Sequence, residues 1–406
     1  MEQIASSQDT QLEGVVVIEN AKGVAASYAG RVLALMGATV IKIEQPGAGD
    51  PLRHEAPPLN KDYDASALFA YLNVNKSSVT LDLSAEAGRE LLGELLDRAS
   101  VFLDDTHPAD RVAWGITPEQ IGHARPNLVY VSVLPFGATG AHSAYRAYEL
   151  NAFHSGGEGY LMPNGLALEM FPERPPVKIY GHFAEFNGGT SAVCATLAAL
   201  LVQLDSGGQF VDVSVQDANV AISCFALQQY GEGVLEVRHE RSFKYGGVLE
   251  CSDGHVEVLT LEQHQWNGLV KLMGSPAWAL QPEFNDALER GRRGAEINKH
   301  LRAWAKTQKV DELVVQGQAL DVPLAKYADA AGVIDSPQTR ARGMFADVEF
   351  AGTGKIPVLA APFQFSLPAK MKAYPALPGA DNARVLCDWL GHSKAELERW
   401  TGARAV

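Results

Sequence analysis

A strand, a helix and a second strand follow one another within the first 44 residues, and this alternation most constrains the fold. Residues 14–20 (GVVVIEN) form a short apolar run rich in β-branched side chains, which is typical of a buried strand. Residues 23–37 (GVAASYAGRVLALMG) predict a helix that ends at Gly37, and residues 38–44 (ATVIKIE) predict the next strand. A βαβ unit of this length requires a parallel sheet, so the chain is predicted to be an α/β protein.

The alternation continues along the chain and then changes character. Further strands, with helices between them, are predicted at residues 78–84, 100–105, 127–136 and 206–215. Residues 245–260 instead favour an antiparallel hairpin with an Asp253-Gly254 turn, and amphipathic helices follow. We therefore expect a large Rossmann-like domain in residues 1–225, a smaller α+β domain in residues 226–330, and a tail, residues 331–406, that returns to helix.

Charge and motif content argue against several classes of function. The formal net charge of −14 disfavours nucleic-acid binding, because phosphate contacts supply most non-specific affinity. The first βα turn, Asn20-Ala21-Lys22-Gly23, lacks the GxGxxG pattern of dinucleotide-binding proteins. The histidines form no HxxxH or HExxH pattern, so no metal is predicted. A polar N-terminus unlike a signal peptide, and apolar runs shorter than about 18 residues, predict a cytoplasmic protein without a membrane span.

The stretch KIYGHFAEFNGGTSAVCATLAALL places a single carboxylate, Glu185, at the start of a long run of small and aliphatic residues. If a helix begins near Asn187, Glu185 lies where unpaired backbone N–H groups favour an anion. One interpretation is a capping carboxylate with no further role. The other is a functional acid, which Gly188 and Gly189 favour because glycine leaves room for a ligand to approach closely.

Two further regions combine polar side chains with glycine. Residues 42–53 (KIEQPGAGDPLR) follow directly on a strand, where open α/β sheets bind ligands, and residues 73–76 add two asparagines and a lysine. Together they suit phosphate groups, although each on its own is more typical of a solvated loop. Residues 147–160 (AYELNAFHSGGEGY) bring Glu149 and His154 into one glycine-rich loop of the kind that is often functional.

Several segments, in order, resemble the class III CoA-transferase family (CaiB/BaiF type), whose members include formyl-CoA transferase, carnitine CoA-transferase and α-methylacyl-CoA racemase. The matching segments are LMGATVIKIEQPGAGDPLR, LNVNKSSVTLDLS, NLVYVSVLPFG, GHFAEFNGGTSAVCATLAALL, SGGQFVDVSVQDA, YGGVLECSDGHVEV, DSPQTRARGMF and VLCDWLG. They extend over nearly the whole chain. The resemblance implies a large Rossmann-like domain built from both chain ends, to which residues 331–406 return, a smaller domain, and an interlocked homodimer.

The resemblance also implies a reaction and a site. The transferases of the family carry an aspartate at the position of Glu185, so this residue would be the nucleophile that forms anhydride and glutamyl-CoA thioester intermediates with acyl-CoA. Glu149 matches an acidic active-site residue of formyl-CoA transferase, and Gly246 and Gly247 resemble the glycine loop that flanks that site. The residues that match the region binding the nucleotide part of CoA are Gln45, Arg53, Asn73, Asn75 and Lys76.

The sequence departs from the family pattern at three points. Glutamate replaces the usual aspartate at residue 185, which moves the carboxylate by about one bond length. The family segment ENFxPG, which contacts CoA, here reads DDTHPAD and places Asp105 in that region. The histidine of the racemases is replaced by Tyr148. The leading prediction is a transferase that moves CoA from an acyl-CoA to a carboxylic acid.

Two alternatives remain open from the sequence. In the first, the protein is an acyl-CoA racemase, isomerase or lyase that uses Glu185 with Glu149 or His154 as acid and base. In the second, it is a CoA-binding protein without catalytic activity.

Overall fold

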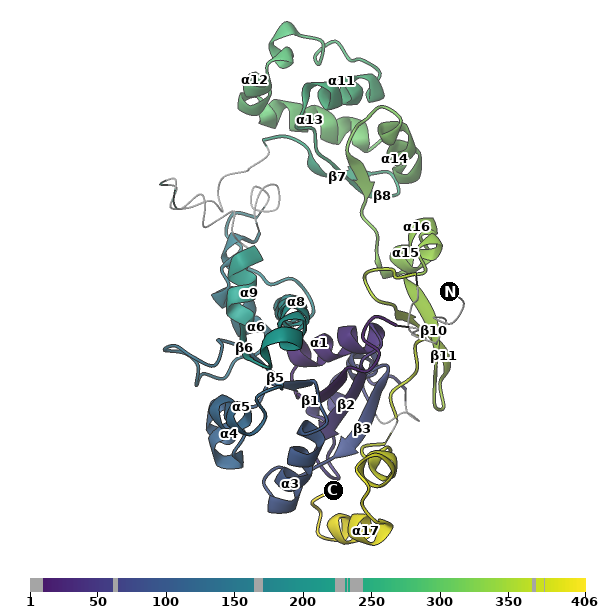
Figure 1. Ribbon diagram of the computed structural model, residues 1–406. Coiled ribbons are helices and arrows are strands. Elements are labelled where there is room, and N and C mark those ends of the chain that lie inside the picture. Colours follow the sequence, from purple (N-terminus) through teal and green to yellow (C-terminus); the bar gives the residue numbers. More distant parts are fainter. Residues whose placement is uncertain are drawn as a thin grey trace, which may run out of the picture. The chain divides into compact units, whose positions relative to one another are not determined.

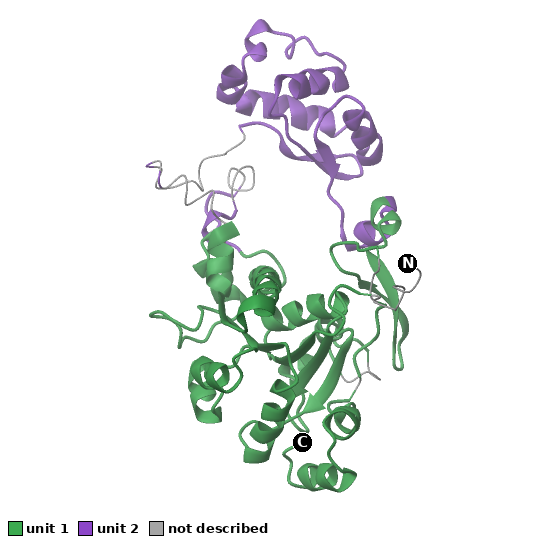
Figure 2. Ribbon diagram, viewed as in Figure 1, with its two compact units in different colours: residues 1–159, 178–224, 338–406 green, residues 160–177, 225–337 purple. Residues whose placement is uncertain are grey.

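The computed structural model describes residues 10–60, 65–163, 171–222, 231, 233, 244–366, 370–375 and 377–406. The predicted boundary between residues 225 and 226 lies outside the described residues. The chain divides into two compact units (Figure 2). Unit 1 contains residues 1–159, 178–224 and 338–406, and unit 2 contains residues 160–177 and 225–337.

Unit 1 is built around a parallel sheet of six strands in the order β3-β2-β1-β4-β5-β6 (Figure 1). The strands are β1 (Val16–Asn20), β2 (Thr39–Glu44), β3 (Lys76–Thr80), β4 (Val101–Asp104), β5 (Val129–Leu134) and β6 (Phe210–Ser214). The chain moves outward in one direction from β1 to β3 and then crosses back to β4, which pairs with the other edge of β1. The neighbouring strands β1 and β4 therefore form a topological switch point, the place where such sheets usually bind ligands.

Helices cover both faces of the sheet. Those of unit 1 up to residue 222 are α1 (Val24–Leu35), η1 (Pro51–His54), α2 (Ala67–Leu72), α3 (Glu86–Leu96), α4 (Pro108–Trp114), α5 (Pro118–Ala124), α6 (Glu149–Ser155), α8 (Phe183–Ser206) and α9 (Val215–Ile222). The short η2 (Glu158–Leu161) follows α6. Helices α1 and α8 pack together, and α3 packs on the opposite face (Figure 1). Helix α1 ends at Leu35, and Gly37 follows with a φ of +97°, as the sequence predicts.

Two glycines set the distance between α8 and its neighbours. A side chain at Gly189 would place its Cβ 2.5 Å from the carbonyl oxygen of Ala25 in α1, and one at Gly188 would meet Val215 at 2.8 Å. The glycines after Glu185 therefore permit close packing of α8, rather than leaving space for a ligand as the sequence suggested. By length and composition α8 could also cross a membrane, which is weak evidence because the core helix of a soluble protein meets the same criterion.

The C-terminal segment returns to the sheet of unit 1. It contributes α16 (Pro337–Ala341), the antiparallel hairpin of β10 (Phe345–Phe350) and β11 (Gly354–Leu359), the π-helix η4 (Ala383–Trp389) and α17 (Lys394–Gly402). Asp381 accepts a hydrogen bond from the backbone N–H of Ser78 at 2.8 Å, beside the edge strand β3. Val385 and Leu386 are buried in the same hydrophobic cluster as Ile18 of β1.

Unit 2 has its own antiparallel sheet and its own core. The sheet has the order β7-β8-β9, with β7 (Gly247–Cys251), β8 (Gly254–Val258) and β9 (Leu324–Lys326). The helices are α11 (Gln263–Leu272), η3 (Pro282–Asn285), α12 (Ala287–Arg292), α13 (Gly294–Ala305), α14 (Val310–Gln318) and α15 (Ala330–Asp335). The core is centred on Trp266, which is 1% exposed. The predicted α/β class with a central parallel sheet is thus confirmed. The predicted hairpin forms, but its two-residue turn is Ser252-Asp253, one residue earlier than predicted, because Gly254 already pairs with Cys251 as the first residue of β8.

Candidate active site

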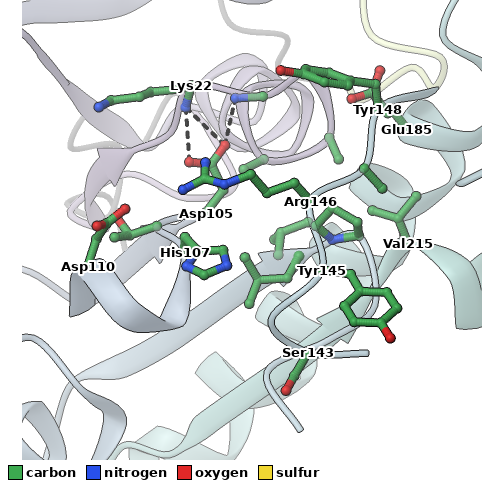
Figure 3. A pocket seen from close by; sticks show the side chains of 18 of the residues that line it. Lys22, Asp105, His107, Asp110, Ser143, Tyr145, Arg146, Tyr148, Glu185 and Val215 are labelled. Carbon is green, nitrogen blue, oxygen red and sulfur yellow. Dashed lines mark hydrogen bonds between the residues drawn. The ribbon is translucent and has the colours of Figure 1, made fainter. Parts of the chain in front are cut away.

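A pocket of about 340 Å³ opens at the carboxyl ends of β1, β4 and β5, at the switch point of the sheet (Figure 3). All of its lining residues belong to unit 1. They are Asn20 at the end of β1 and Lys22, Gly23, Ala25 and Ala26 after it, Asp105, Thr106, His107, Asp110 and Trp114 after β4, Val133 and Leu134 of β5 with Pro135 after it, Ser143, Tyr145, Arg146, Ala147 and Tyr148 before α6, and Glu185 and Val215. The fold therefore joins Glu185 to three strand ends that are distant in the sequence.

Glu185 lies in the first turn of α8, which begins at Phe183, four residues earlier than the sequence suggested. Its side chain is 18% exposed. His182, the residue that precedes the helix, lies with its Nδ1 atom 2.7 Å from Oε2 of Glu185. Within the described residues the other carboxylate oxygen, Oε1, has no hydrogen-bond partner. The hydrogen bond to Glu185 raises the pKa of His182 above its usual value.

The carboxylate that caps α8 is Glu149. It accepts hydrogen bonds from the backbone N–H groups of Ala184, at 3.2 Å, and of Glu185, at 3.0 Å. Lys178 pairs with it at 3.3 Å and also donates to the carbonyl oxygens of Ile179 and Gly181. Glu149 thus satisfies the helix N-terminus, and the side chain of Glu185 is left to face the pocket.

Asp105 occupies the N-terminus of α1 on another wall of the pocket. Its carboxylate accepts hydrogen bonds from the backbone N–H of Lys22, at 3.0 and 2.9 Å, and of Gly23, at 2.6 Å (Figure 3). Burial raises the pKa of Asp105 to about 7, and the negative charge of Asp104 adds to the effect of burial against the two backbone donors. The position where Rossmann folds commonly bind phosphate is therefore filled by a side chain of the protein itself.

Three side chains with nitrogen donors also line the pocket: Lys22, Arg146 and His107. The Nδ1 atom of His107 accepts a hydrogen bond from the backbone N–H of Ala109, and its Nε2 atom contacts the carbonyl oxygen of Ala144 at 3.0 Å. Figure 3 shows Glu185 and Tyr148 at one end of the pocket and Lys22 and Asp110 toward the other. Our site prediction from sequence did not include these donors. Their positions in the sequence could have indicated a role in the site, because Lys22 and His107 each follow closely on a predicted strand of the parallel sheet, where such sheets bind ligands.

The residues predicted to bind the nucleotide part of CoA lie in another part of unit 1. Arg53 is 3% exposed and binds both oxygens of Glu44, through Nε at 2.6 Å and a terminal nitrogen at 2.9 Å. The Nζ atom of Lys76 is fully enclosed and donates to Glu19, to the Ser27 carbonyl and to Asn73. These contacts direct both cations to partners inside the protein, and they do not support nucleotide binding.

Two other residues of that predicted set have structural contacts as well. Asn75, at a φ of +64°, donates to the carbonyl oxygen of Lys370 and accepts from the backbone N–H of Lys372. Gln45 forms a bridge with Gly49 in the loop after β2. None of Gln45, Arg53, Asn73, Asn75 and Lys76 lines the pocket that contains Glu185.

The remaining predicted site residues are His154, on α6, and two glycines of unit 2. His154 is exposed on α6, packs against the ring of Phe153, and does not line the pocket. Gly246 and Gly247 belong to unit 2, where both have a positive φ, and the Gly246 N–H donates to Asn298 at 2.9 Å. In the described part of the chain no three His, Cys, Asp or Glu side chains gather in a way that could hold a metal ion.

The comparisons with known proteins show the family and the fold of the chain. The profile of CoA-transferase family III matches residues 12–382. Curated relatives in Escherichia coli and Shigella boydii, named formyl-CoA:oxalate CoA-transferase, are 27% identical over 416 aligned residues that cover 96% of this chain and 97% of theirs. A CaiB/BaiF family protein from Brucella suis superposes with a TM-score of 0.81 at 27% identity, covering 94% of this chain and all of that one. A Mycobacterium tuberculosis protein, at 24% identity, shares the fold with a TM-score of 0.78 over 92% of this chain and 98% of its own.

A parallel α/β sheet with a carboxylate in a pocket at its switch point is the arrangement in which open α/β proteins usually bind their ligands, along the carboxyl edge of the sheet. The chain belongs to CoA-transferase family III. It is therefore an enzyme of the CoA-transferase class, and coenzyme A, carried as acyl-CoA, is its substrate.

Proposed function

We propose that this enzyme transfers CoA from an acyl-CoA to a carboxylic acid by covalent catalysis on Glu185. The observation that carries the proposal is the position of Glu185, whose carboxylate lines the switch-point pocket with one oxygen held by His182. The other oxygen has no partner within the described residues and is available as a nucleophile. A carboxylate is a competent nucleophile toward a thioester when it is held close to the carbonyl carbon.

The reaction proceeds through four exchanges without net proton transfer. Glu185 attacks the acyl carbonyl, the C–S bond breaks, and CoA leaves as thiolate from a mixed anhydride. The thiolate then attacks the Glu185 carbonyl, the anhydride C–O bond breaks, and the donor acid leaves, so that a glutamyl-CoA thioester remains. The acceptor carboxylate attacks this thioester and releases the thiolate. The thiolate finally attacks the acceptor carbonyl of the second anhydride, which gives the new acyl-CoA and frees Glu185.

The pocket suits one part of the CoA molecule. A volume of about 340 Å³ is at the small end of ligand sites, and it accommodates the pantetheine arm with the thioester beside Glu185. Lys22 and Arg146 supply positive charge along the pocket for the phosphate groups. Asp105 already accepts the N–H groups at the start of α1, so we place the phosphates on these side chains rather than on that helix terminus.

The racemase, isomerase or lyase alternative is not favoured. It requires two groups that flank the acidic α-carbon, so a second acid or base must face the substrate from the side opposite Glu185. His154 does not line the pocket, and Glu149 is already engaged by two backbone N–H groups and Lys178.

We also propose that the enzyme is a cytoplasmic homodimer, interlocked as in its family, that binds neither nucleic acid nor a membrane. Leu201 and Leu204 on α8 are 71% and 81% exposed, which supports a protein partner on that helix. The net charge of −14 supports the exclusion of nucleic acid. Light scattering of the purified protein tests the dimer, because a monomer would contradict it.

Intact-protein mass spectrometry after incubation with a panel of acyl-CoAs tests the chemistry. The native chain should gain the mass of CoA, less one water, on Glu185, and the Glu185→Gln variant should not. The acyl-CoA that gives the adduct identifies the donor. If acyl-CoAs that demonstrably bind leave no adduct at any stage of turnover, Glu185 is not the nucleophile.

A further inference from the structure

The hydrogen bond between His182 and Glu185 distinguishes the two oxygens of the carboxylate. Oε2 lies 2.7 Å from Nδ1 of His182, and Oε1 is the oxygen without a partner within the described residues. A carboxylate only accepts hydrogen bonds, so the proton of this contact is on Nδ1 when Glu185 is ionised. His182 immediately precedes α8 and Glu185 is three residues further on, which places both side chains on the same side of the first turn.

This asymmetry fixes which oxygen reacts. If Oε1 attacks the acyl-CoA, Oε1 becomes the bridging oxygen of the anhydride and Oε2 becomes the carbonyl oxygen of Glu185. The subsequent attack of the CoA thiolate on Cδ of Glu185 moves an electron pair onto Oε2. The N–H of His182 already points at that atom, at the distance required of an oxyanion donor.

We propose that His182 is the oxyanion donor for every step that occurs at the carbonyl of Glu185 itself, and that it fixes the glutamate so that Oε1 is the nucleophile. This inference rests on the proposed function, in which Glu185 forms an anhydride and a thioester. It adds a catalytic residue that neither the sequence analysis nor the family comparison assigns to the site.

The contribution of the hydrogen bond differs from step to step. It stabilises the ionised Glu185 of the resting enzyme, so it does not accelerate the first attack on acyl-CoA. Once Glu185 is acylated, Oε2 is a neutral carbonyl oxygen and a weaker acceptor. The bond strengthens again as the tetrahedral oxyanion develops on Oε2, and it therefore accelerates the formation and the consumption of the glutamyl-CoA thioester.

The charges around His182 favour a protonated ring. Glu185 on α8 and Glu149 on α6 both stabilise the imidazolium, and Lys178, in the segment before α8, opposes them. The imidazole is also packed near the ring of Phe186, with 6.4 Å between the ring centroids. A partly buried donor of this kind needs no reorientation when the charge on Oε2 develops.

The same contact explains how glutamate can replace the shorter aspartate. Glutamate has one more rotatable bond, and an unrestrained carboxylate would sample several positions in the pocket. The hydrogen bond from His182 selects one of them. A displacement of about 1 Å at a reacting group can cost around a hundredfold in rate, so this restraint is significant for catalysis.

The test compares His182→Ala, which removes the donor, with His182→Asn, whose side-chain amide can donate from nearly the position of Nδ1. His392→Ala is the matched control, because His392 contacts a carboxylate at 2.8 Å in the same way, but that carboxylate, Glu94, does not line the pocket. For each variant, rapid-quench mass spectrometry gives the rates of acylation and of thioester formation. Steady-state assays give kcat, KM, and the ratio of acyl-CoA hydrolysis to transfer.

In His182→Ala we expect kcat to fall by about 10²- to 10³-fold, as for the loss of one oxyanion donor, with little change in KM for acyl-CoA. Thioester formation should slow more than acylation. The ratio of acyl-CoA hydrolysis to transfer should rise, because the anhydride persists longer. His182→Asn should recover most of kcat, and His392→Ala should match the native enzyme. Melting curves confirm that each variant is folded.

Two results would overturn the inference: native rates of thioester formation in His182→Ala, or equal losses in His182→Ala and His182→Asn. Failure of the proposed function has a different signature, since the native enzyme itself would then form no CoA adduct on Glu185.

Discussion

Glu149 accepts a hydrogen bond from the backbone N–H of Glu185 at 3.0 Å, across 36 residues of sequence. The sequence left open whether Glu185 is the capping carboxylate of α8. In the structure Glu149 is the cap, and Glu185 is one of the residues whose N–H it accepts. The same carboxylate binds the N–H of Ala184, and Lys178 balances its charge. Glu149 thus sets the position of the first turn of α8, and through it the position of the candidate nucleophile.

The first prediction concerns this cap. Glu149→Ala should lower the free energy of unfolding by about 0.5–2 kcal/mol, because two N–H groups of α8 lose their acceptor. It should also reduce kcat, since the turn that carries Glu185 is no longer fixed. Glu149→Gln keeps an acceptor oxygen and should show the smaller effect on both quantities. Thermal unfolding and steady-state kinetics measure them, and an undisturbed kcat in Glu149→Ala would contradict the positioning role.

The second prediction separates a structural from a ligand-binding role for Arg53. Burial alone would raise the pKa of Glu44, but hydrogen bonds from Arg53 and Ser78 outweigh it and lower the pKa to about 2. Arg53→Met leaves this charge buried without its cation, which should cost about 3–5 kcal/mol of stability.

Denaturant unfolding and CoA titration of Arg53→Met measure the two roles separately. We expect unchanged CoA affinity at a temperature where the variant is folded. A tenfold loss of affinity with full stability would instead support the nucleotide contact predicted from the sequence.

The sheet could be predicted from the sequence because buried parallel strands and the helices between them have distinct local patterns. Residues 14–20 and 38–44, for example, contain β1 and β2. The strand order could not be predicted in the same way, since the pairing of β1 with β4 joins Val17 to Val101. Such contacts depend on how the whole chain packs, and no short window contains that information.

For the same reason, only part of the candidate site could be predicted from the sequence. Glu185 stands out as a single acid before a long apolar segment, and the structure places it in the pocket. Arg53 and Lys76 follow or begin strands, as ligand-binding cations often do, but sequence does not reveal whether a side chain turns inward. Here each one meets a buried acid, Glu44 and Glu19 respectively. His182 and Glu149 act through distances that only the folded chain defines.

The third prediction concerns the pH dependence of stability. The pKa of Asp105 is raised to about 7 in the folded protein, whereas an unfolded aspartate titrates near its usual value of about 4. Between these values the folded state binds the proton and the unfolded state does not. Asp105 therefore makes the free energy of unfolding fall as the pH rises from about 4 to about 7, by up to roughly 1.4 kcal/mol per pH unit.

Replacing Asp105 by asparagine should remove this slope, because the amide does not titrate but can still accept the N–H groups of Lys22 and Gly23. Denaturant unfolding at several pH values measures it. Asp105→Asn should be more stable than the native protein at pH 8, and the difference should shrink toward pH 4. Parallel pH profiles for the two proteins would mean that Asp105 titrates as an ordinary exposed carboxylate.

The fourth prediction is that the contribution of His182 to kcat depends on the length of the side chain at residue 185. Aspartate is shorter by one methylene, so in Glu185→Asp the carboxylate no longer reaches Nδ1 of His182, which is 2.7 Å from Oε2 in the native protein. Glu185→Asp should therefore lower kcat by about a hundredfold, although aspartate is the residue that the family usually carries. Adding His182→Ala should then cost little more, whereas the same change costs 10²- to 10³-fold beside the native glutamate. Steady-state kinetics of the native enzyme, both single variants and the double variant give this coupling. If the two changes multiply, His182 acts independently of Glu185, and the short contact between them has no part in catalysis.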